Sequence, residues 1–483
     1  MHEAQDDALH LPLLRAGKPY FTLDTAPLVD VRSGEPLGRI SQAIPGIIDR
    51  DLRHAEENRR RLDAFTVAEL IEICHKAAKL FGEAELPIYP GAERAFSPDD
   101  YLRHLSATTG MPEALGRMNL AKITEVMGGI EGVLDGLTRG LDLSVLDGGW
   151  GMDGDRRLSY QRLTSTLGAV LPNNSPGVHN LWVPAIPLKV KLVLRTGSSE
   201  PWTPYRIATA MIEAGAPPEA FSLYPSGHGA VPSILVGTGR SMFFGDQSTV
   251  ESWKGTGKVQ IHGPGWSKVI FDEGAAESWA EHLDMLCSSV AMNGGRSCIN
   301  CSGVWTPKNG RAIADAMARK LAAITARPLG DPEAALAAFP DPEVARLISA
   351  MIDDQLETPG AEDLTALYRQ GPRVAEAGGC TFLQPTVIHL TDPDHPLASA
   401  EFIFPFVTVV DAPEETLLDA VGPTLIGTVI AESDDFIRRA LECKHIDRLN
   451  LGPIPTYKIS WDQPHEGNLF DHLYHQRAFQ MVS

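Results

Sequence analysis

The stretch Leu167-Gly-Ala-Val-Leu-Pro172 is a short apolar run that ends at a proline. A similar run, Val190-Lys-Leu-Val-Leu-Arg195, follows it, and helical patterns such as Pro204–Ala214 lie between the runs. Strands that alternate with helices predict a parallel sheet with crossover helices. Such sheets bind ligands at the carboxyl ends of their strands. The middle of the chain therefore predicts an α/β fold with a binding site at that edge.

The same alternation continues towards the C-terminus, where a second α/β unit is expected to start near Val269. Upstream of the first unit, the pattern from Gly46 to about Val145 is helical. A chain of 483 residues has room for more than one domain, and no internal repeat or low-complexity segment interrupts it. The helices expected in the second unit are Ala275–Ala291, Gly310–Ala326 and Asp341–Asp354, and the strands are Thr386–Leu390, Phe404–Val410 and Leu425–Ala431.

The composition argues against several classes of function. Hydrophobic residues make up 43% and charged residues 22% of the chain, close to the average of soluble globular proteins. Lys plus Arg is 42 and Asp plus Glu is 62, so the formal net charge is -20, which disfavours nucleic acid and anionic membranes as partners. No apolar stretch is long enough to span a membrane, and the N-terminus does not resemble a secretory signal. Six cysteines do not make a disulfide framework, so a reducing cytoplasm is expected.

The segment Asn293-Gly-Gly-Arg-Ser-Cys298-Ile-Asn-Cys301 places two glycines before a cysteine, just after an apolar helical run. A cysteine close to a helix N-terminus or to a cation has a lowered pKa and serves as a thiolate nucleophile. Three other interpretations are a buried core cysteine, a redox pair of Cys298 with Cys301, and half of a zinc site. A redox pair is expected after an early strand, and a zinc site needs a second pair of ligands. The histidines at 445, 465, 472 and 475 do not clearly complete one, so no metal site is predicted.

Several motifs, in order along the chain, resemble those of the aldehyde dehydrogenase superfamily. The segment Asn293–Cys298 is similar to the family's Asn-x-Gly-Gln-x-Cys loop, and Pro172-Asn-Asn-Ser-Pro176 is similar to Pro-Trp-Asn-Phe-Pro. Ala400-Glu401-Phe-Ile-Phe-Pro405 resembles Glu-Glu-Ile-Phe-Gly-Pro, and Phe244-Gly-Asp246 resembles the Thr-Gly-Ser turn. Each motif alone is weak, but their order and spacing span nearly the whole chain. On these motifs the chain is identified as a member of the superfamily.

The resemblance implies a two-lobed α/β fold. Residues 1–265 would form an N-terminal helical extension and a Rossmann-like dinucleotide-binding lobe. Residues 266–449 would form an α/β catalytic lobe with Cys298, and residues 450–483 an oligomerisation tail that returns to the first lobe or contacts a partner subunit. A homodimer or homotetramer is implied. The tail motif Trp461-Asp-Gln-Pro-His-Glu-Gly467 departs from the family and is expected to shape the substrate tunnel.

The chemistry that the resemblance implies is covalent. Cys298 would add to the carbonyl carbon of an aldehyde, hydride would pass to NAD or NADP, and an acyl thioester would remain on the cysteine. The negative charge that develops on the carbonyl oxygen needs preorganised donors. The side-chain amide of Asn174 and the backbone N–H of Cys298 have the matching family positions. The alternative for Asn174 is a turn residue before Pro176, since asparagine is common in turns.

The resemblance also assigns residues to the cofactor. Arg195 takes the position of a lysine that faces the adenosine ribose, and Glu401 that of a glutamate that hydrogen-bonds the nicotinamide ribose. Gly245 and Asp246 belong to the turn beside the pyrophosphate, where the family has serine in place of Asp246. Because a carboxylate beside a phosphate is unfavourable, Asp246 is equally well explained as a helix N-cap. For Arg195 the alternative is an exposed strand end.

The choice between NAD and NADP depends on Ser198. Members of the family that prefer NAD often have a glutamate at this position, where it binds the 2′-hydroxyl of the ribose. A neutral Ser198 beside the cationic Arg195 would tolerate a 2′-phosphate, because arginine binds phosphate well. Glu200 is close enough in the sequence to reverse that inference, so both cofactors stay open.

The most informative departure from the family is His262. Val259-Gln-Ile-His262-Gly-Pro-Gly265-Trp-Ser267 resembles Val-x-Leu-Glu-Leu-Gly-Gly-Lys-Ser, in which the glutamate activates water against the acyl-enzyme. Members that pass the acyl group to coenzyme A lack this glutamate, and a thiol ionises more readily than water. We therefore favour an acylating enzyme, which run backwards would reduce an acyl-CoA to an aldehyde. The alternatives are His262 as the base of a hydrolytic enzyme, His262 as a structural residue, and a relative that has lost turnover.

Overall fold

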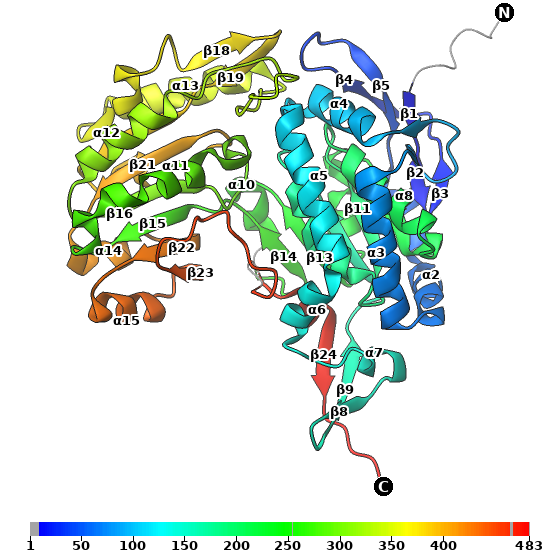
Figure 1. Ribbon diagram of the computed structural model, residues 1–483. Coiled ribbons are helices and arrows are strands. Elements are labelled where there is room, and N and C mark those ends of the chain that lie inside the picture. The colour runs from blue at the N-terminus through cyan, green and yellow to red at the C-terminus, as the bar shows by residue number, and fades with distance from the viewer. Residues whose placement is uncertain (1–8, 254, 464–466, 483) are drawn as a thin grey trace, which may run out of the picture.

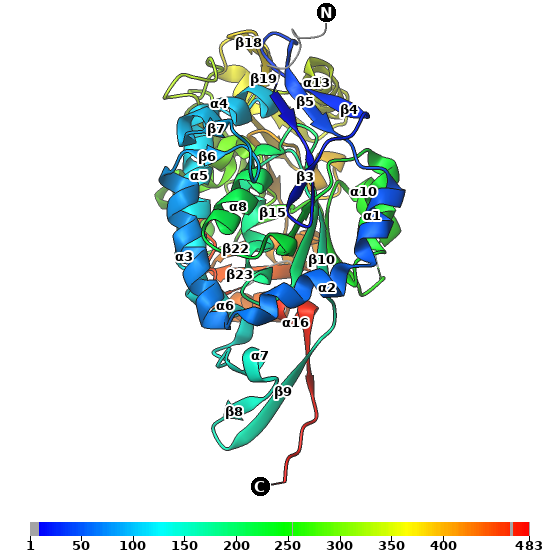
Figure 2. The ribbon, with the colours of Figure 1, turned by 90° about the vertical axis from the view of Figure 1, so that its right-hand side faces the viewer.

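The structure, a computed structural model, describes residues 9–253, 255–463 and 467–482 and consists of two lobes that lie side by side (Figure 1). Each lobe is built around a seven-stranded sheet with helices packed on it. A narrow ribbon of strands projects from the first lobe, and the chain ends beyond it (Figures 1 and 2).

The sheet of the first lobe has the strand order β14-β13-β10-β11-β12-β2-β3. Its parallel strands are β10 (Thr166–Val170), β11 (Lys191–Arg195), β12 (Phe221–Leu223), β13 (Arg240–Phe244) and β14 (Val259–His262), and β2 (Leu13–Arg15) and β3 (Lys18–Tyr20) add an antiparallel edge. The strands β10 and β12 are buried along their whole length, as expected of strands covered on both faces. The alternation that starts at Leu167 therefore folds into a parallel sheet.

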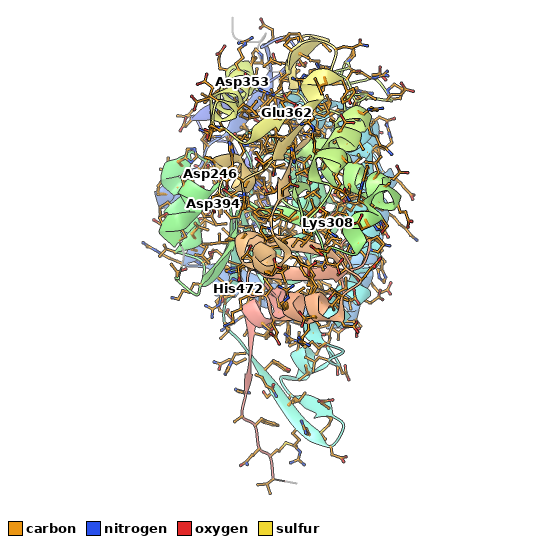
Figure 3. All side chains as sticks on the ribbon, turned by 90° about the vertical axis from the view of Figure 1, so that its left-hand side faces the viewer. Asp246, Lys308, Asp353, Glu362, Asp394 and His472 are labelled. Atoms are coloured by element: carbon orange, nitrogen blue, oxygen red, sulfur yellow. The ribbon has the colours of Figure 1, made fainter. Side chains whose placement is uncertain are left out.

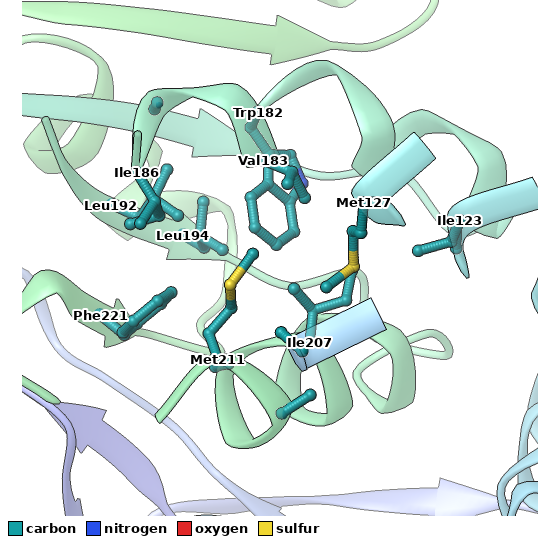
Figure 4. Close-up of a cluster of buried hydrophobic side chains, with 14 of the residues drawn as sticks. Ile123, Met127, Trp182, Val183, Ile186, Leu192, Leu194, Ile207, Met211 and Phe221 are labelled. Atoms are coloured by element: carbon teal, nitrogen blue, oxygen red, sulfur yellow. The ribbon is translucent and has the colours of Figure 1, made fainter. Parts of the chain in front are cut away.

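Three helices of the first lobe pack against one another beside this sheet: α3 (Val67–Glu83), α5 (Glu113–Gly128) and α8 (Trp202–Glu213). The apolar side chains between the helices and the sheet are buried. Figure 4 shows Trp182 beside Met127 of α5 and Met211 of α8. Ile123 and Met127 mark the face of α5 that belongs to this core. The opposite face of α5 points towards the second lobe.

The remaining elements of the first lobe are short. A three-stranded sheet near the N-terminus contains β1 (Leu9–Leu11), β5 (Pro36–Ser41) and β4 (Thr25–Val29). The other helices are α1 (Pro45–Leu52), α2 (Ala55–Arg59), α4 (Pro98–Thr109), α6 (Ile130–Thr138), α7 (Val145–Gly148), α9 (Val231–Leu235) and α10 (Gln247–Val250).

The sheet of the second lobe has the order β17-β20-β21-β16-β15-β22-β23 and is parallel except for β17. The strands are β17 (Ala361–Asp363), β20 (Thr386–Leu390), β21 (Phe406–Asp411), β16 (Cys301–Thr306), β15 (Ser267–Phe271), β22 (Thr424–Ile430) and β23 (Ile446–Leu451). The helices are α11 (Leu283–Ala291), α12 (Gly310–Leu321), α13 (Pro342–Leu356), α14 (Glu414–Ala420) and α15 (Asp434–Glu442).

One predicted helix is broken in the structure. The segment Ala275–Ala291 forms two 3-10 turns, Ala275–Glu277 and Trp279–His282, before α11 begins. The break falls at Ser278, whose hydroxyl donates to the carbonyl of Ala275 at 3.3 Å. A serine that bonds its own backbone competes with helical hydrogen bonding, so a 17-residue helix predicted from the apolar pattern alone was wrong in this part.

The tail of the chain crosses back to the first lobe. Helix α16 (Leu469–Leu473) adds its apolar residues to that lobe's core, and β24 (Tyr474–Arg477) pairs with β9 (Arg156–Arg162), which pairs with β8 (Gly151–Asp153). These three strands form the projecting ribbon of Figures 1 and 2. Of the tail motif 461–467, Trp461 packs against the core of the first lobe, and residues 464–466 lie outside the described part of the chain.

Candidate active site

A cavity of about 1350 Å³ lies between the two lobes. The first lobe contributes the carboxyl ends of β10, β11, β13 and β14, as parallel sheets generally do for their ligands. The second lobe contributes the segments that precede β15, β16 and β21, which is the amino edge of its sheet. The cavity is thus enclosed by opposite edges of two parallel sheets.

The first lobe brings five of the predicted residues to this cavity. Asn174 follows β10, Arg195 ends β11, Gly245 and Asp246 follow β13 and His262 ends β14, and all five line it. Neighbouring parallel strands end at the same edge of a sheet, so residues far apart in the sequence become neighbours in space.

On the side of the second lobe, Cys298 lies in the turn before β16, half-buried and open to the cavity. Cys301 is the first residue of β16, and burial raises the pKa of its thiol to about 12. Such a thiol is not ionised at neutral pH and does not act as a nucleophile. No group of three or more His, Cys, Asp or Glu side chains in the described ranges could hold a metal ion. The burial of Cys301 disfavours a redox pair with Cys298, and the described side chains do not gather into a zinc site.

The backbone before Cys298 explains the two glycines of its motif. Asn293, Gly294 and Gly295 have φ angles of 55°, 65° and 71°, in the left-handed region that favours glycine and tolerates asparagine. At Gly295 there is a second reason, because a Cβ atom there would lie 2.3 Å from the backbone of Phe404. The loop can take this path only with glycine at that position.

Asn293 links this loop to two other parts of the site. Its Oδ1 accepts a hydrogen bond from Asn119 Nδ2 of α5 at 2.8 Å. Its Nδ2 donates to Ser175 Oγ at 3.0 Å and to Ser297 Oγ at 3.1 Å. The two serines adjoin the predicted oxyanion donor and the nucleophile in the sequence, so one buried amide joins α5, the turn after β10 and the nucleophile's loop.

Asn174 contacts the same loop directly. Its Nδ2 donates to the carbonyl oxygen of Arg296 at 2.9 Å, and the amide carries a second hydrogen that it can offer to the cavity. The guanidinium of Arg296 is buried and donates to the carbonyls of Thr109, at 2.8 Å, and Ala338. Burial lowers the pKa of Arg296 to about 10. This guanidinium anchors the loop to two neighbouring segments.

Gly265 fixes Cys298 from the other side. A Cβ atom on Gly265 would lie only 1.8 Å from the carbonyl oxygen of Cys298, and Ser267 Oγ donates to that oxygen at 2.9 Å. The carboxylate of Glu401 accepts the backbone N–H of Gly265 at 3.0 Å and that of Trp266. Glu401 lines the cavity, and its carboxylate holds the segment between β14 and β15 that joins the lobes.

His262 lies between the large cavity and a much smaller one. Its ring stacks on that of Phe244, with centroids 4.4 Å apart and an interplanar angle of 13°. The smaller cavity, of about 40 Å³, is lined by His262 and by Asn180, which is 1% exposed. Within the described residues neither amide atom of Asn180 has a hydrogen-bond partner. A cavity of this size has room for one water molecule, for which the Asn180 amide is a polar partner.

Arg195 lies on the part of the cavity predicted for the nucleotide. Its Nε donates to the carbonyl of Ser226 at 3.0 Å, and burial lowers its pKa. Val231, Pro232 and Trp253 line the same region with apolar surface. A cation beside flat apolar walls suits a phosphorylated nucleoside, so a dinucleotide fits the residues present here.

Asp246 caps a helix. Its Oδ1 accepts the hydroxyl of Ser248 at 2.6 Å and the backbone N–H of Thr249 at 2.9 Å, in the first turn of α10. These hydrogen bonds, that of Ser248 first, lower the pKa of Asp246. The side chain lies at the molecular surface (Figure 3). Of the two interpretations of Asp246, the N-cap is the one that the geometry supports.

Two residues that follow Arg195 in the sequence lie outside the cavity, contrary to the roles considered for them. Ser198 is exposed and does not line the cavity; Asn173 Nδ2 donates to its hydroxyl at 3.4 Å. Glu200 is buried, where it accepts His179 Nε2 at 2.8 Å and the backbone N–H of Thr203 at 2.9 Å. Glu200 is therefore a structural residue inside the first lobe, and the suggestion that it could bind the ribose was wrong.

One charged residue of the cavity was missed in the sequence. Lys122 of α5 lines it close enough to Cys298 for the two charges to interact. Burial lowers the pKa of Lys122, and a negative charge on Cys298 raises it. The sequence signal was Asn119 and Lys122, three residues apart on one helix, which puts both on one face.

Comparison with known proteins agrees with this geometry. The model of the aldehyde dehydrogenase family matches residues 99–420. The chain belongs to the aldehyde dehydrogenase family. A sequence search of curated proteins finds no match.

Solved structures of the family share this fold at low sequence identity. The aldehyde dehydrogenase KauB from Pseudomonas aeruginosa is 14% identical with a TM-score of 0.78, over 97% of this chain and 96% of that one. The 3,6-anhydro-L-galactose dehydrogenase in complex with NAP is 14% identical with a TM-score of 0.75, over 98% and 99%. The indole-3-acetaldehyde dehydrogenase complexed with NAD+ is 15% identical with a TM-score of 0.72, over 97% and 95%. The family, the enzyme class and the two-lobed α/β fold predicted from the sequence are thus confirmed.

As an aldehyde dehydrogenase, the chain departs from its family at positions that touch the site. Of the residues at which its motifs depart from those of the family, His262 and the buried Arg296 line the cavity. Among the described residues, no helix has both the length and the apolar character needed to cross a bilayer.

Substitution of Gly265 by alanine should disrupt the site. Because the Cβ atom would overlap the carbonyl of Cys298, we expect Gly265→Ala to lower turnover by about a hundredfold, as misplacement of a catalytic group by about 1 Å does. The measurement is steady-state aldehyde oxidation together with the melting temperature. Gly229→Ala is the matched control, since a Cβ atom there meets nothing within 4 Å. Wild-type turnover in Gly265→Ala would contradict the contact.

Proposed function

We propose that this aldehyde dehydrogenase uses NAD or NADP to oxidise an aldehyde through a thioester on Cys298, and that it passes the acyl group to coenzyme A. The proposal rests on one observation above all: a half-buried cysteine opens onto a cavity in which no carboxylate occupies the position of the family's water-activating glutamate. In the reverse direction the enzyme would reduce an acyl-CoA to an aldehyde.

The two lobes would have different roles in the reaction. Residues 1–265 would bind the dinucleotide, residues 266–449 would carry Cys298, and residues 450–483 would take part in a homo-oligomer. Arg195 would face the adenosine ribose, Gly245 would let the backbone approach the pyrophosphate, and Glu401 would bind the nicotinamide ribose with the oxygen lone pairs that its two backbone contacts leave available. Relatives of the same fold are complexed with NAP and with NAD+. Bound nicotinamide supplies the acceptor for hydride.

The residues of this chain would act in two stages. The thiolate of Cys298 adds to the carbonyl carbon, and Asn174 Nδ2 and the backbone N–H of Cys298 donate to the oxyanion. Loss of hydride from the same carbon re-forms the C=O bond and leaves a thioester. The thiolate of coenzyme A then adds to that carbonyl and Cys298 leaves as a thiolate, so the nucleophile is regenerated and the proton of the incoming thiol is released.

The hydrogen bonds and positions of the carboxylates in the cavity favour a thiol over water as the acceptor of the acyl group. Three line it among the described residues: Glu125, Asp246 and Glu401. Asp246 caps α10, Glu401 accepts two backbone N–H groups, and Glu125 is exposed on α5. Water needs a general base to attack a thioester, whereas a thiol with a pKa of about 8–9 supplies its own anion. Thiolysis is therefore the reaction that depends least on a carboxylate.

A second candidate function is hydrolysis with His262 as base. The specific observation in its favour is the small cavity behind His262, where Asn180 offers a buried amide to one water molecule. An imidazole has an unperturbed pKa of about 6.5, which suits a base at neutral pH.

The direct test is a panel of acyl-CoAs with NADH or NADPH, followed by nicotinamide absorbance. We expect oxidation of the dinucleotide with release of aldehyde, and no turnover in Cys298→Ala, which should still bind the cofactor. Aldehyde oxidation to free acid without any need for coenzyme A would exclude the acylating proposal. Cofactor binding without turnover in either direction would indicate a relative that has lost activity.

A variant of His262 separates the two acceptors. In His262→Gln, which keeps a polar side chain but lacks a base, thiolysis should change by less than about threefold, whereas a hydrolysis that depends on His262 should fall by about a hundredfold or more. The measurement compares thioester consumption with and without coenzyme A in single-turnover experiments. A hundredfold loss of thiolysis would show that the histidine acts on the thiol too, against the proposal.

A further inference from the structure

Helix α5 turns one face to the cavity. Met118, Asn119, Lys122 and Glu125 line it, and their spacing of three or four residues places them on the same side of the helix. The opposite side, with Met127, is embedded in the core of the first lobe (Figure 4). The helix is therefore held from behind, and Lys122 is a cation presented to the cavity by a rigid element.

The ammonium of Lys122 forms no ion pair within the described structure, although the charges of Cys298 and Glu125 act on it from a distance. It makes no ion pair or hydrogen bond with any described side chain or backbone group. Its Nζ lies 5.8 Å from the ring centroid of Trp461 and would be 3.9 Å from a Cβ atom on Gly177. Glu125, one turn along α5, is exposed and does not pair with it. A half-buried ammonium that forms no ion pair can gain a charge-assisted hydrogen bond from an anionic group that a ligand brings.

We propose that Lys122 binds a carboxylate at the end of the aldehyde substrate remote from its carbonyl group, so that the enzyme selects aldehydes that carry an acid. This rests on the proposed oxidation of an aldehyde at Cys298 and adds the class of the substrate.

The surroundings of Lys122 suit such a molecule. Val178, Leu181 and Trp461 line the cavity around it and offer apolar and aromatic surface to a short methylene chain. The exposed Lys458 lines the same cavity and adds a second positive charge. In a chain of formal net charge -20, two cations that line one cavity make a local field that attracts an anion.

The physical basis of selection is the cost of leaving the ammonium unpaired. A substrate that ends in a methyl group would displace water from Lys122 without replacing its hydrogen bonds. A site that contains a buried polar group rejects such analogues strongly, because the group is then left without a partner. A carboxylate instead gains a charge-assisted hydrogen bond.

The competing role for Lys122 is stabilisation of the Cys298 thiolate. The two charges interact, but Lys122 makes no hydrogen bond to Cys298 Sγ, and its contacts are with Trp461 and the region of Gly177. If the main role of Lys122 were to stabilise the thiolate, Lys122→Met would raise the pH at which Cys298 reacts with iodoacetamide. If its main role is to bind a remote carboxylate, the substitution would leave that pH profile largely unchanged.

The experiment compares short straight-chain aldehydes that end in a carboxylate with matched aldehydes that end in a methyl group. We expect the wild type to prefer the acids, and Lys122→Met to lower the ratio of their kcat/KM values by about tenfold or more, through KM. Lys122→Arg should retain part of the preference. Lys444→Met removes an exposed ammonium that does not line the cavity and should leave the ratio within about threefold.

A binding measurement makes the outcome independent of turnover. Titration calorimetry with glutarate should detect binding to the wild type and a loss of about tenfold or more in Lys122→Met. Absence of any preference for acids in the wild type would overturn the proposal while leaving the proposed function intact. Equal losses for both aldehyde classes, with a shifted iodoacetamide profile, would assign Lys122 to the thiolate instead. If no aldehyde is oxidised, the proposed function fails, and glutarate binding alone decides the role of Lys122.

Discussion

The site depends on the contact between the backbone of Gly265 and the carbonyl of Cys298. No side chain fits between them, Ser267 donates to the same carbonyl, and Glu401 holds the backbone N–H of Gly265 from the cavity side. The segment in question runs from the last strand of the first sheet to the first strand of the second. The place where the chain passes between lobes is therefore also the place that fixes the nucleophile. The close backbone contact between Gly265 and Cys298 therefore joins the lobe proposed to bind the cofactor to the lobe that carries the nucleophile.

The side-chain amides of two asparagines also position the cysteine loop. Asn293 joins α5, the turn after β10 and the cysteine loop, and Asn174 bonds the carbonyl of Arg296 in that loop. In a medium of low dielectric constant, such hydrogen bonds are strong and their loss is costly. These amides are neutral, so they orient the site without placing a negative charge beside the thiolate of Cys298, and Lys122 is a cation whose charge interacts with that of the cysteine.

The sequence predicted what depends on period and motif, and missed what depends on tertiary contacts. Runs such as Val190–Arg195 predicted the parallel sheet, and the carboxyl-end rule accounts for the convergence of Asn174 and His262. Spacing along the chain could not show that Glu200 turns inward to His179, twenty-one residues away, while Ser198 faces solvent. Lys122 was missed because a lysine on a helix is usually solvated; only the second lobe makes its face a cavity wall.

The central claim is that the acyl group of the substrate is carried by the sulfur of Cys298. The most direct measurement mixes the enzyme with an aldehyde and NAD+ or NADP+ in the absence of coenzyme A, quenches it with acid during the first turnover, and analyses its peptides by mass spectrometry. The account predicts one equivalent of acyl adduct on the peptide that contains Cys298, formed together with the reduced dinucleotide and removed by added coenzyme A. Reduced dinucleotide without an adduct on that peptide, or an adduct on another cysteine, would contradict it.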